Sequence, residues 1–195
     1  LHFALFSIST SQEIKFLPRI KTVSSTPFAR FVNSATKQDF VAVGSSYVNL
    51  LPIDGTPHHC NFTPGLYDKQ EAECVLSQMR QSGYNVVRTF IDKGHPHRNR
   101  LAIYGADGPF DNNTPSLYKP YMDNFIDFLT RATKHQIYVI VAFESWPYTK
   151  FYSELVFSGS PDIEGRHNRT ILSENGIKAK EIYLTKFVEY IKKIN

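Results

Sequence analysis

Three apolar runs rich in Val, Ile and Phe alternate with helix-like segments along this chain, and this alternation constrains the fold more than any other feature. The runs cover residues 40–48, 85–91 and 137–143. Near-continuous apolar strands are typical of a parallel sheet that helices bury on both faces. The sequence therefore predicts an α/β fold, in which the functional side chains lie where the strands end.

The segments that follow the runs have the periodicity of amphipathic helices. Asp68 and Glu71 form a capping-box pattern at the start of the first helix. Pro120 suits the first turn of a second helix, which extends to about His135. A third helix is predicted over residues 177–194. Its apolar stripe consists of Tyr183, Leu184, Phe187, Val188 and Ile191. The predicted order of elements is β-α-β-α-β-α.

Two architectures have this order, the open doubly wound sheet and the (β/α)8 barrel. The first run is not followed by the Gly-rich turn of a dinucleotide-binding sheet. It is followed by a long loop, residues 49–67, which favours the barrel. A complete barrel needs about 250 residues, and this chain has 195. We therefore expect a partial (β/α)8 barrel over residues 30–195 that lacks its C-terminal half, after a leader over residues 1–29 that is a signal remnant or disordered.

Composition and charge exclude some functional classes. The chain is 42% hydrophobic and 21% charged, with a formal net charge of +4. These values are ordinary for a globular domain. The basic residues are scattered, which argues against a nucleic-acid partner. No apolar run reaches the roughly 18 residues that cross a bilayer, so no membrane segment is predicted.

Several residues point to an oxidising, extracellular location. Three sequons for N-glycosylation start at Asn61, Asn112 and Asn168, all in predicted loops. Cys60 and Cys74 are the only cysteines. Their pairing would tie down the first long loop, while two free thiols are the alternative. We expect a secreted or extracellular protein.

The segments GYNVVRTF (residues 83–90) and IYVIVAFESWP (137–147) resemble the N-terminal half of clan A glycoside hydrolases, in particular family 5 endoglycanases such as β-mannanases and cellulases. The stretch FVNSATKQDFVAVGSSYVNLL (31–51) is similar to the start of those enzymes, where a short N-terminal hairpin leads into the first barrel strand. The resemblance covers residues 30–195. It implies a retaining hydrolase of a β-linked mannan or glucan that needs no cofactor.

In the resembled family an arginine at the position of Arg88 hydrogen-bonds the nucleophilic carboxylate and lowers its pKa. The two catalytic glutamates of such enzymes end the fourth and seventh strands, and lie about 5 to 5.5 Å apart. Both would follow the segments that this chain contains, so we expect the chain to be inactive. Glu144 ends the third strand, where the family has His or Asn, and is interpreted as a substrate-binding residue.

Aromatic and polar residues near the predicted strand ends are candidates for a sugar-binding wall. Trp146 and Tyr148 follow the third strand and offer flat faces for a pyranose, although packing inside the loop is the alternative. Tyr47, with His58 or His59, would line the opposite side.

Three further residues are candidates for other roles. Asp92, just beyond the second strand, reads as an exposed loop acid. His95 and His97 have the spacing of a metal site, which keeps a metal-dependent hydrolase as a third possibility. A barrel that binds carbohydrate without cleaving it is the closer alternative, because it shares every feature above except the downstream acids.

Overall fold

The computed structural model describes residues 17–24, 28–53, 56–92, 105–109, 111–143, 149–157 and 172–193. The chain divides into two compact units, Leu1–Val41 and Ala42–Asn195. The second unit contains the strand and helix repeats that the sequence predicts.

The first unit contains an antiparallel hairpin of β1 (Ile20–Ser24) and β2 (Ala29–Asn33), in which Ile20 pairs with Asn33. A short N-terminal hairpin was expected, but β1 falls within residues 1–29, which were assigned to a leader. The backbone N–H of Phe40 donates to the carbonyl of Phe31 at 2.8 Å. Phe40 therefore belongs to this unit and not to the parallel sheet.

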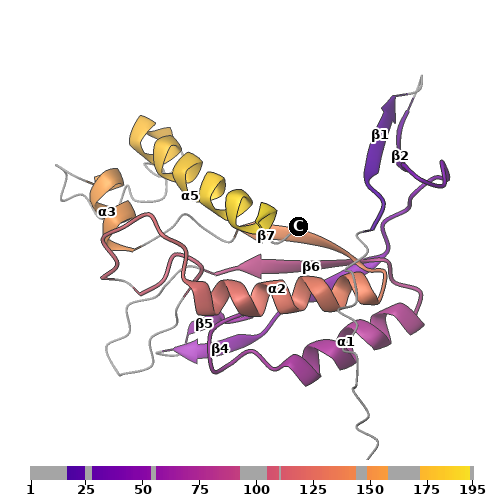
Figure 1. Cartoon of the computed structure of the whole chain (residues 1–195), viewed down its shortest axis with the longest axis horizontal. Helices are drawn as coiled ribbons and strands as arrows, with labels where there is room; N and C mark the ends of the chain where they lie inside the picture. The colour runs from indigo at the N-terminus through magenta and orange to yellow at the C-terminus, as the bar shows by residue number, and fades with distance from the viewer. Residues whose placement is uncertain are drawn as a thin grey trace, which may run out of the picture. The chain divides into compact units, whose positions relative to one another are not determined.

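The second unit is built on a sheet of three parallel strands in the order β3-β6-β7 (Figure 1). Its strands are β3 (Gly44–Tyr47), β6 (Val86–Ile91) and β7 (Tyr138–Phe143). A hairpin of β4 (Leu50–Ile53) and β5 (Thr56–His59) lies in the loop after β3. The helices of the described part are α1 (Lys69–Gln81), α2 (Lys119–Lys134), α3 (Lys150–Phe157) and α5 (Glu174–Lys192). The parallel α/β prediction is confirmed, whereas the described strands do not close into a barrel.

The helices begin and end for local reasons that the sequence shows. The side chain of Asp68 accepts hydrogen bonds from the N–H groups of Gln70 and Glu71 at the start of α1. Pro120 lies in the first turn of α2, and His135 caps its end. These two helices have the predicted boundaries to within a residue or two.

The C-terminal part contains one helix that the predicted order of elements lacks, and the predicted third helix is only partly as expected. The additional helix is α3, which ends at Phe157. The apolar stripe of α5 divides into two. Tyr183 and Phe187 are buried, while Leu184 and Val188 are 40% and 48% exposed.

The core lies between one face of the sheet and the helices α1, α2 and α5. Strand side chains alternate between the two faces, and Val87 and Ile91 of β6 point to the helices, where both are buried. They join a cluster that includes Leu76 of α1, Phe125 of α2 and Phe187 of α5. The described helices therefore cover one face of the sheet, whereas the sequence predicted helices on both faces.

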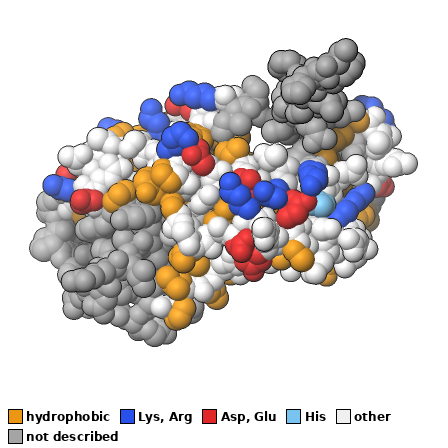
Figure 2. All heavy atoms as spheres, turned by 60° about the horizontal axis from the view of Figure 1, so that its bottom comes forward, with side chains coloured by type: hydrophobic (Ala, Val, Ile, Leu, Met, Phe, Trp, Pro, Cys, Tyr) orange, Lys and Arg blue, Asp and Glu red, His pale blue; other side chains and the backbone are white. Residues whose placement is uncertain are grey.

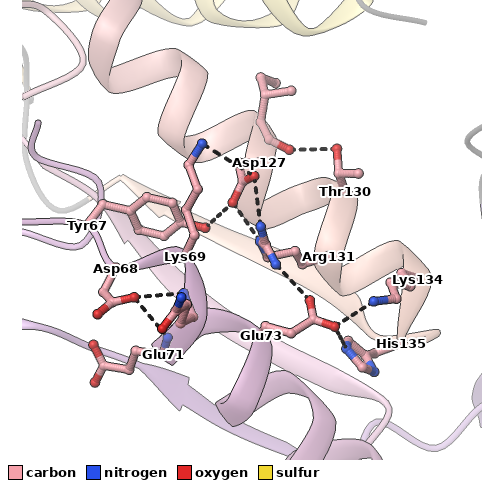
Figure 3. A network of polar contacts seen from close by, with 12 residues as sticks. Tyr67, Asp68, Lys69, Glu71, Glu73, Asp127, Thr130, Arg131, Lys134 and His135 are labelled. Atoms are coloured by element: carbon pink, nitrogen blue, oxygen red, sulfur yellow. Dashed lines mark hydrogen bonds and ion pairs between the residues drawn. The ribbon is translucent and has the colours of Figure 1, made fainter. Parts of the chain in front are cut away.

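An ion-pair network joins α1 to α2 on their exposed side (Figure 3). Glu73 accepts hydrogen bonds from Lys134 at 2.7 Å and from Arg131 at 3.0 Å, and Nε2 of His135 lies 3.0 Å from its carboxylate. The bonds from Lys134, His135 and Arg131 lower the pKa of Glu73 to about 2. Glu73 is therefore charged at neutral pH and ties the end of α2 to α1.

Arg131 extends this network to a second carboxylate. Its Nε donates to Asp127 at 2.7 Å, and the hydroxyl of Tyr67 donates to the same carboxylate at 2.8 Å. Figure 2 shows cationic and anionic side chains interspersed on the face that it displays, without a stripe of one sign. The charges of this network hold α1 and α2 together.

Candidate functional site

The face of the sheet that the helices leave uncovered carries an exposed arginine. Arg88 and Phe90 point away from α1 and α2, because they alternate with the buried Val87 and Thr89. In the strand register Arg88 is paired with Ile140 of β7, which is 51% exposed. We call the surface formed by Ser46, Arg88, Phe90 and Ile140 the open face.

Arg88 lies in the middle of β6, not at its end as the sequence suggested. Its guanidinium carbon lies 4.5 Å from the centre of the Phe90 ring. The ring of His59, at the end of β5, stacks on the same phenyl group at 4.5 Å and 25°. No carboxylate among the described residues forms an ion pair with Arg88. A cation–π contact at an exposed site contributes about 0.5–1 kcal/mol, and it uses none of the five N–H donors of Arg88, which no described residue engages.

The end of β6 leads into a buried aspartate. Asp92 is 2% exposed, which corrects its interpretation as an exposed loop acid. The hydroxyl of Tyr121 donates to its carboxylate at 3.0 Å and accepts from its backbone N–H at 2.9 Å. Burial raises the pKa of Tyr121 well above its usual value. This tyrosine therefore stays protonated and fixes the chain where it leaves the sheet.

A second buried aspartate, which the sequence analysis missed, lies close to the first. Asp107 is fully buried and accepts a hydrogen bond from the N–H of Thr149 at 3.2 Å. Burial, reinforced by the charge of Asp107, raises the pKa of Tyr152 and of Tyr183. Because the N–H of Ala106 donates to the carbonyl of Asp92 at 3.1 Å, both acids belong to one polar cluster beyond the end of β6.

The residues of the first loop turn inward. Tyr47 is 4% exposed, and its ring centre lies 4.8 Å from that of Phe128, so it packs in the core and presents no surface to a sugar. Burial raises the pKa of Tyr47 to about 12. His58 is partly buried and faces Leu51 across the β4-β5 hairpin.

Asn61 is fully buried, and a glycan on it does not fit this structure. Its amide nitrogen, the atom that would carry the sugar, donates to the carbonyl of Tyr47 at 3.0 Å and to the hydroxyl of Thr89 at 2.9 Å. Asn112 is partly exposed, and its amide donates to the carbonyl of Asp107 at 3.0 Å. Asn61 thus joins the first loop to β6 instead of marking a surface site.

Both cysteines are free in the structure. This agrees with the second of the two possibilities that the sequence left open, two free thiols instead of a disulfide. Cys60 is buried, and its thiol donates to the carbonyl of Asn49 at 3.4 Å. Burial raises the pKa of this thiol to about 11, so it is poorly nucleophilic at neutral pH. Cys74 is exposed on α1.

The remaining predicted residues lie outside the described part of the chain. They are Glu144, Trp146, Tyr148, His95, His97 and Asn168. Within the residues that the structure describes, no group of three or more His, Cys, Asp or Glu side chains is arranged to hold a metal ion. None of the helices there is both long enough and apolar enough to cross a bilayer.

Comparisons with protein-family models, with curated proteins and with solved structures found no match for this chain. No family assignment follows from them.

Proposed function

We propose that this chain forms part of the substrate wall of a glycoside hydrolase of the barrel type, which acts on a β-linked polysaccharide of the mannan or glucan kind. The observation that carries the proposal is Arg88, an exposed and permanently charged group on the open face of a parallel sheet. The resembled enzymes place a supporting arginine in the corresponding strand.

The surroundings of Arg88 suit a sugar. Phe90 and His59 provide aromatic rings beside its donors. A carbohydrate-binding site needs both, because a sugar has apolar C–H faces and hydroxyl groups that accept hydrogen bonds. Ile91 and Phe143 are partners in the strand register, so β6 and β7 end at the same edge of the sheet. Glu144 is the next residue in the sequence after Phe143, and we propose it as a further contact for hydroxyl groups.

The two buried aspartates beyond β6 do not act as the catalytic acids in this proposal. Asp92 and Asp107 are both buried, and each accepts a hydrogen bond within the fold. Retaining hydrolysis needs one carboxylate that attacks the sugar and one that protonates the leaving oxygen. The resemblance assigns both to later strands, so the 195-residue chain should bind oligosaccharides without cleaving them.

The test is calorimetric titration of the chain with mannohexaose and with cellohexaose. We expect binding of one of them, and a loss of affinity of at least tenfold in Arg88→Gln. Arg80→Gln removes an exposed arginine of α1 and should leave the affinity unchanged. Release of reducing sugar, or equal affinity of Arg88→Gln and the unchanged chain, contradicts the proposal.

A protein that binds carbohydrate without cleaving it is the second candidate, and the buried state of Asp92 and Asp107 is compatible with it. The two candidates differ in whether an Asn-Glu pair follows a fourth apolar strand in the full coding sequence. A secreted location is proposed with either one. It is supported by the sequons at Asn112 and Asn168, and enzymatic deglycosylation followed by mass spectrometry would test it.

A further inference from the structure

The described part of the segment between β6 and α2 forms a loop at the end of the sheet where β6 leaves it. The N–H of Ala106 donates to the carbonyl of Asp92 at 3.1 Å, and the N–H of Tyr118 donates to the carbonyl of Ala106 at 2.8 Å. Figure 1 shows this loop at the arrowhead of β6 and beside α3, where the N–H of Phe151 donates to the carbonyl of Asn112 at 3.0 Å. In parallel sheets, ligands bind beyond the carboxyl ends of the strands, which is the side on which this loop lies.

The loop encloses a hollow of about 390 Å³. Small-molecule sites typically measure about 300–1,000 Å³, so the hollow has room for a sugar unit. Its lining includes Gly108, Asp111, Asn112, Ser116, Leu117 and Tyr118. No residue of the open face lines it, so the hollow is a second site and not an extension of the surface around Arg88.

Hydrogen bonds within the loop fix the walls of the hollow. The side-chain amide of Asn112 donates to the carbonyl of Asp107 at 3.0 Å, and its oxygen accepts from the N–H of Thr114 at 3.1 Å. Gly108 has a φ of 92°, which a glycine adopts without strain, and its N–H donates to the carbonyl of Gly105 at 3.1 Å. A site whose walls are already in place loses little conformational entropy when a ligand binds.

The hollow combines hydrogen-bond acceptors with apolar surface. Asp111 is exposed, and its carboxylate forms no hydrogen bond or ion pair with another described residue. Ser116 adds an exposed hydroxyl, while Leu117 and Tyr118 are partly buried and add an apolar side chain and an aromatic ring. A carboxylate accepts hydrogen bonds from hydroxyl groups, and an aromatic ring packs on an apolar face. None of the residues that line the hollow is cationic, which disfavours an anionic ligand.

We propose that this hollow binds one neutral sugar unit of the polysaccharide, at a distance along the chain from the unit that contacts Arg88. The inference rests on the proposed function for the identity of the sugar, a β-linked mannan or glucan. Asp111 accepts hydrogen bonds from the hydroxyl groups of this unit, and Tyr118 packs on its C–H face. The hollow thus adds affinity for long oligosaccharides that short ones do not gain.

The experiment is a titration of the isotope-labelled chain with mannohexaose and with cellohexaose, followed by nuclear magnetic resonance. The chain is prepared without glycans, because Asn112 lines the hollow. We expect the amide signals of Gly108 and Ser116, in the hollow, to shift together with those of Arg88 and Phe90 on the open face. The corresponding disaccharides should shift only the signals of the open face.

Asp111→Asn keeps the size of the side chain and removes its charge and one acceptor. It should weaken binding of the hexasaccharide by about three- to tenfold, the effect of one hydrogen bond, and leave binding of the disaccharide unchanged. Glu181→Gln removes an exposed carboxylate of α5 outside the hollow and should change neither affinity. Both positions are exposed, so both variants should fold, which circular dichroism checks.

The two sites report separately, so each proposal can fail alone. Shifts on the open face without shifts in the hollow overturn the second site and leave the proposed function in place. Equal affinity of Asp111→Asn and the unchanged chain for the hexasaccharide has the same meaning. Shifts in the hollow alone support sugar binding there and contradict the role of Arg88, while the absence of shifts at both sites overturns both proposals.

Discussion

Replacing Asn61 by Asp tests whether the buried amide holds the first loop to the sheet. The exchange keeps the size and shape of the side chain. It replaces the nitrogen that donates to the carbonyl of Tyr47 and to the hydroxyl of Thr89, while the other oxygen still accepts from the N–H of Asn49 at 2.7 Å. The effect therefore comes from the lost donor and the added charge alone.

The size of the effect follows from the three contacts. The carbonyl of Tyr47 loses its donor, which costs about 1–3 kcal/mol for a buried group. The hydroxyl of Thr89 can rotate and donate to the new carboxylate, so that contact survives. A carboxylate buried without a cationic partner adds a penalty, and truncated buried pairs of this kind lose about 3–5 kcal/mol. We expect Asn61→Asp to lower the free energy of unfolding at pH 7 by about 3–5 kcal/mol.

The pH dependence identifies the cause. Burial raises the pKa of the introduced carboxyl in the folded chain above its value in the unfolded chain. The folded state therefore binds the proton more tightly, and the loss of stability should shrink as the pH falls from 7 to 5. Urea unfolding of unglycosylated protein, followed by circular dichroism, measures both quantities. Asn113→Asp, at an exposed position, should change stability by less than about 0.5 kcal/mol. A loss for Asn61→Asp below about 1 kcal/mol, or one independent of pH, would refute the reasoning.

Three further substitutions test the sheet, its exit and the helix pair. Gly44→Ala should lower stability by about 1–3 kcal/mol in urea unfolding, because a Cβ there meets the backbone carbonyl of Val86; unchanged stability would mean that β3 and β6 lie further apart. Tyr121→Phe removes the hydroxyl that bonds the backbone N–H and the carboxylate of the buried Asp92, and should cost about 1–3 kcal/mol, seen as a lower thermal midpoint. Glu73→Gln should cost at most about 1 kcal/mol at pH 7, since the ion pairs are partly exposed. The lowered pKa of Glu73 stabilises the fold above pH 4.5 and loses that contribution as the pH falls toward 2, so the two chains should converge in acid.

The helices α1 and α2 were predictable because their signals are local. Capping by Asp68 and the position of Pro120 depend on residues within one turn. The direction of the sheet was also predictable, since helices that connect successive strands favour parallel pairing. The start of β3 was not predictable, because Phe40, which the apolar pattern assigned to this strand, forms its hydrogen bond with Phe31. Both residues belong to the unit Leu1–Val41.

The stripe of α5 shows the limit of periodicity. The spacing of apolar residues placed Leu184 and Phe187 in one apolar stripe of the helix. Periodicity says which residues share a side of a helix, but not how many neighbours the fold provides for that side. α5 has a partner for Phe187 in Phe143, and no described residue covers Leu184 in the same way.

The polar residues of the site were misjudged for a related reason. Asn61 and Asp92 follow strands, as exposed functional residues do, yet each of them, like Asp107, has a partner 28 to 42 residues away in the sequence. One signal in the sequence could have revealed this arrangement. Thr89 occupies the same side of its strand as Val87, so it had to be buried, and a buried hydroxyl requires a partner. A search for that partner among nearby loops leads to a side chain with a free amide, and Asn61 supplies it. Polar residues on the apolar side of a predicted strand are therefore better guides to buried networks than polar residues at its end.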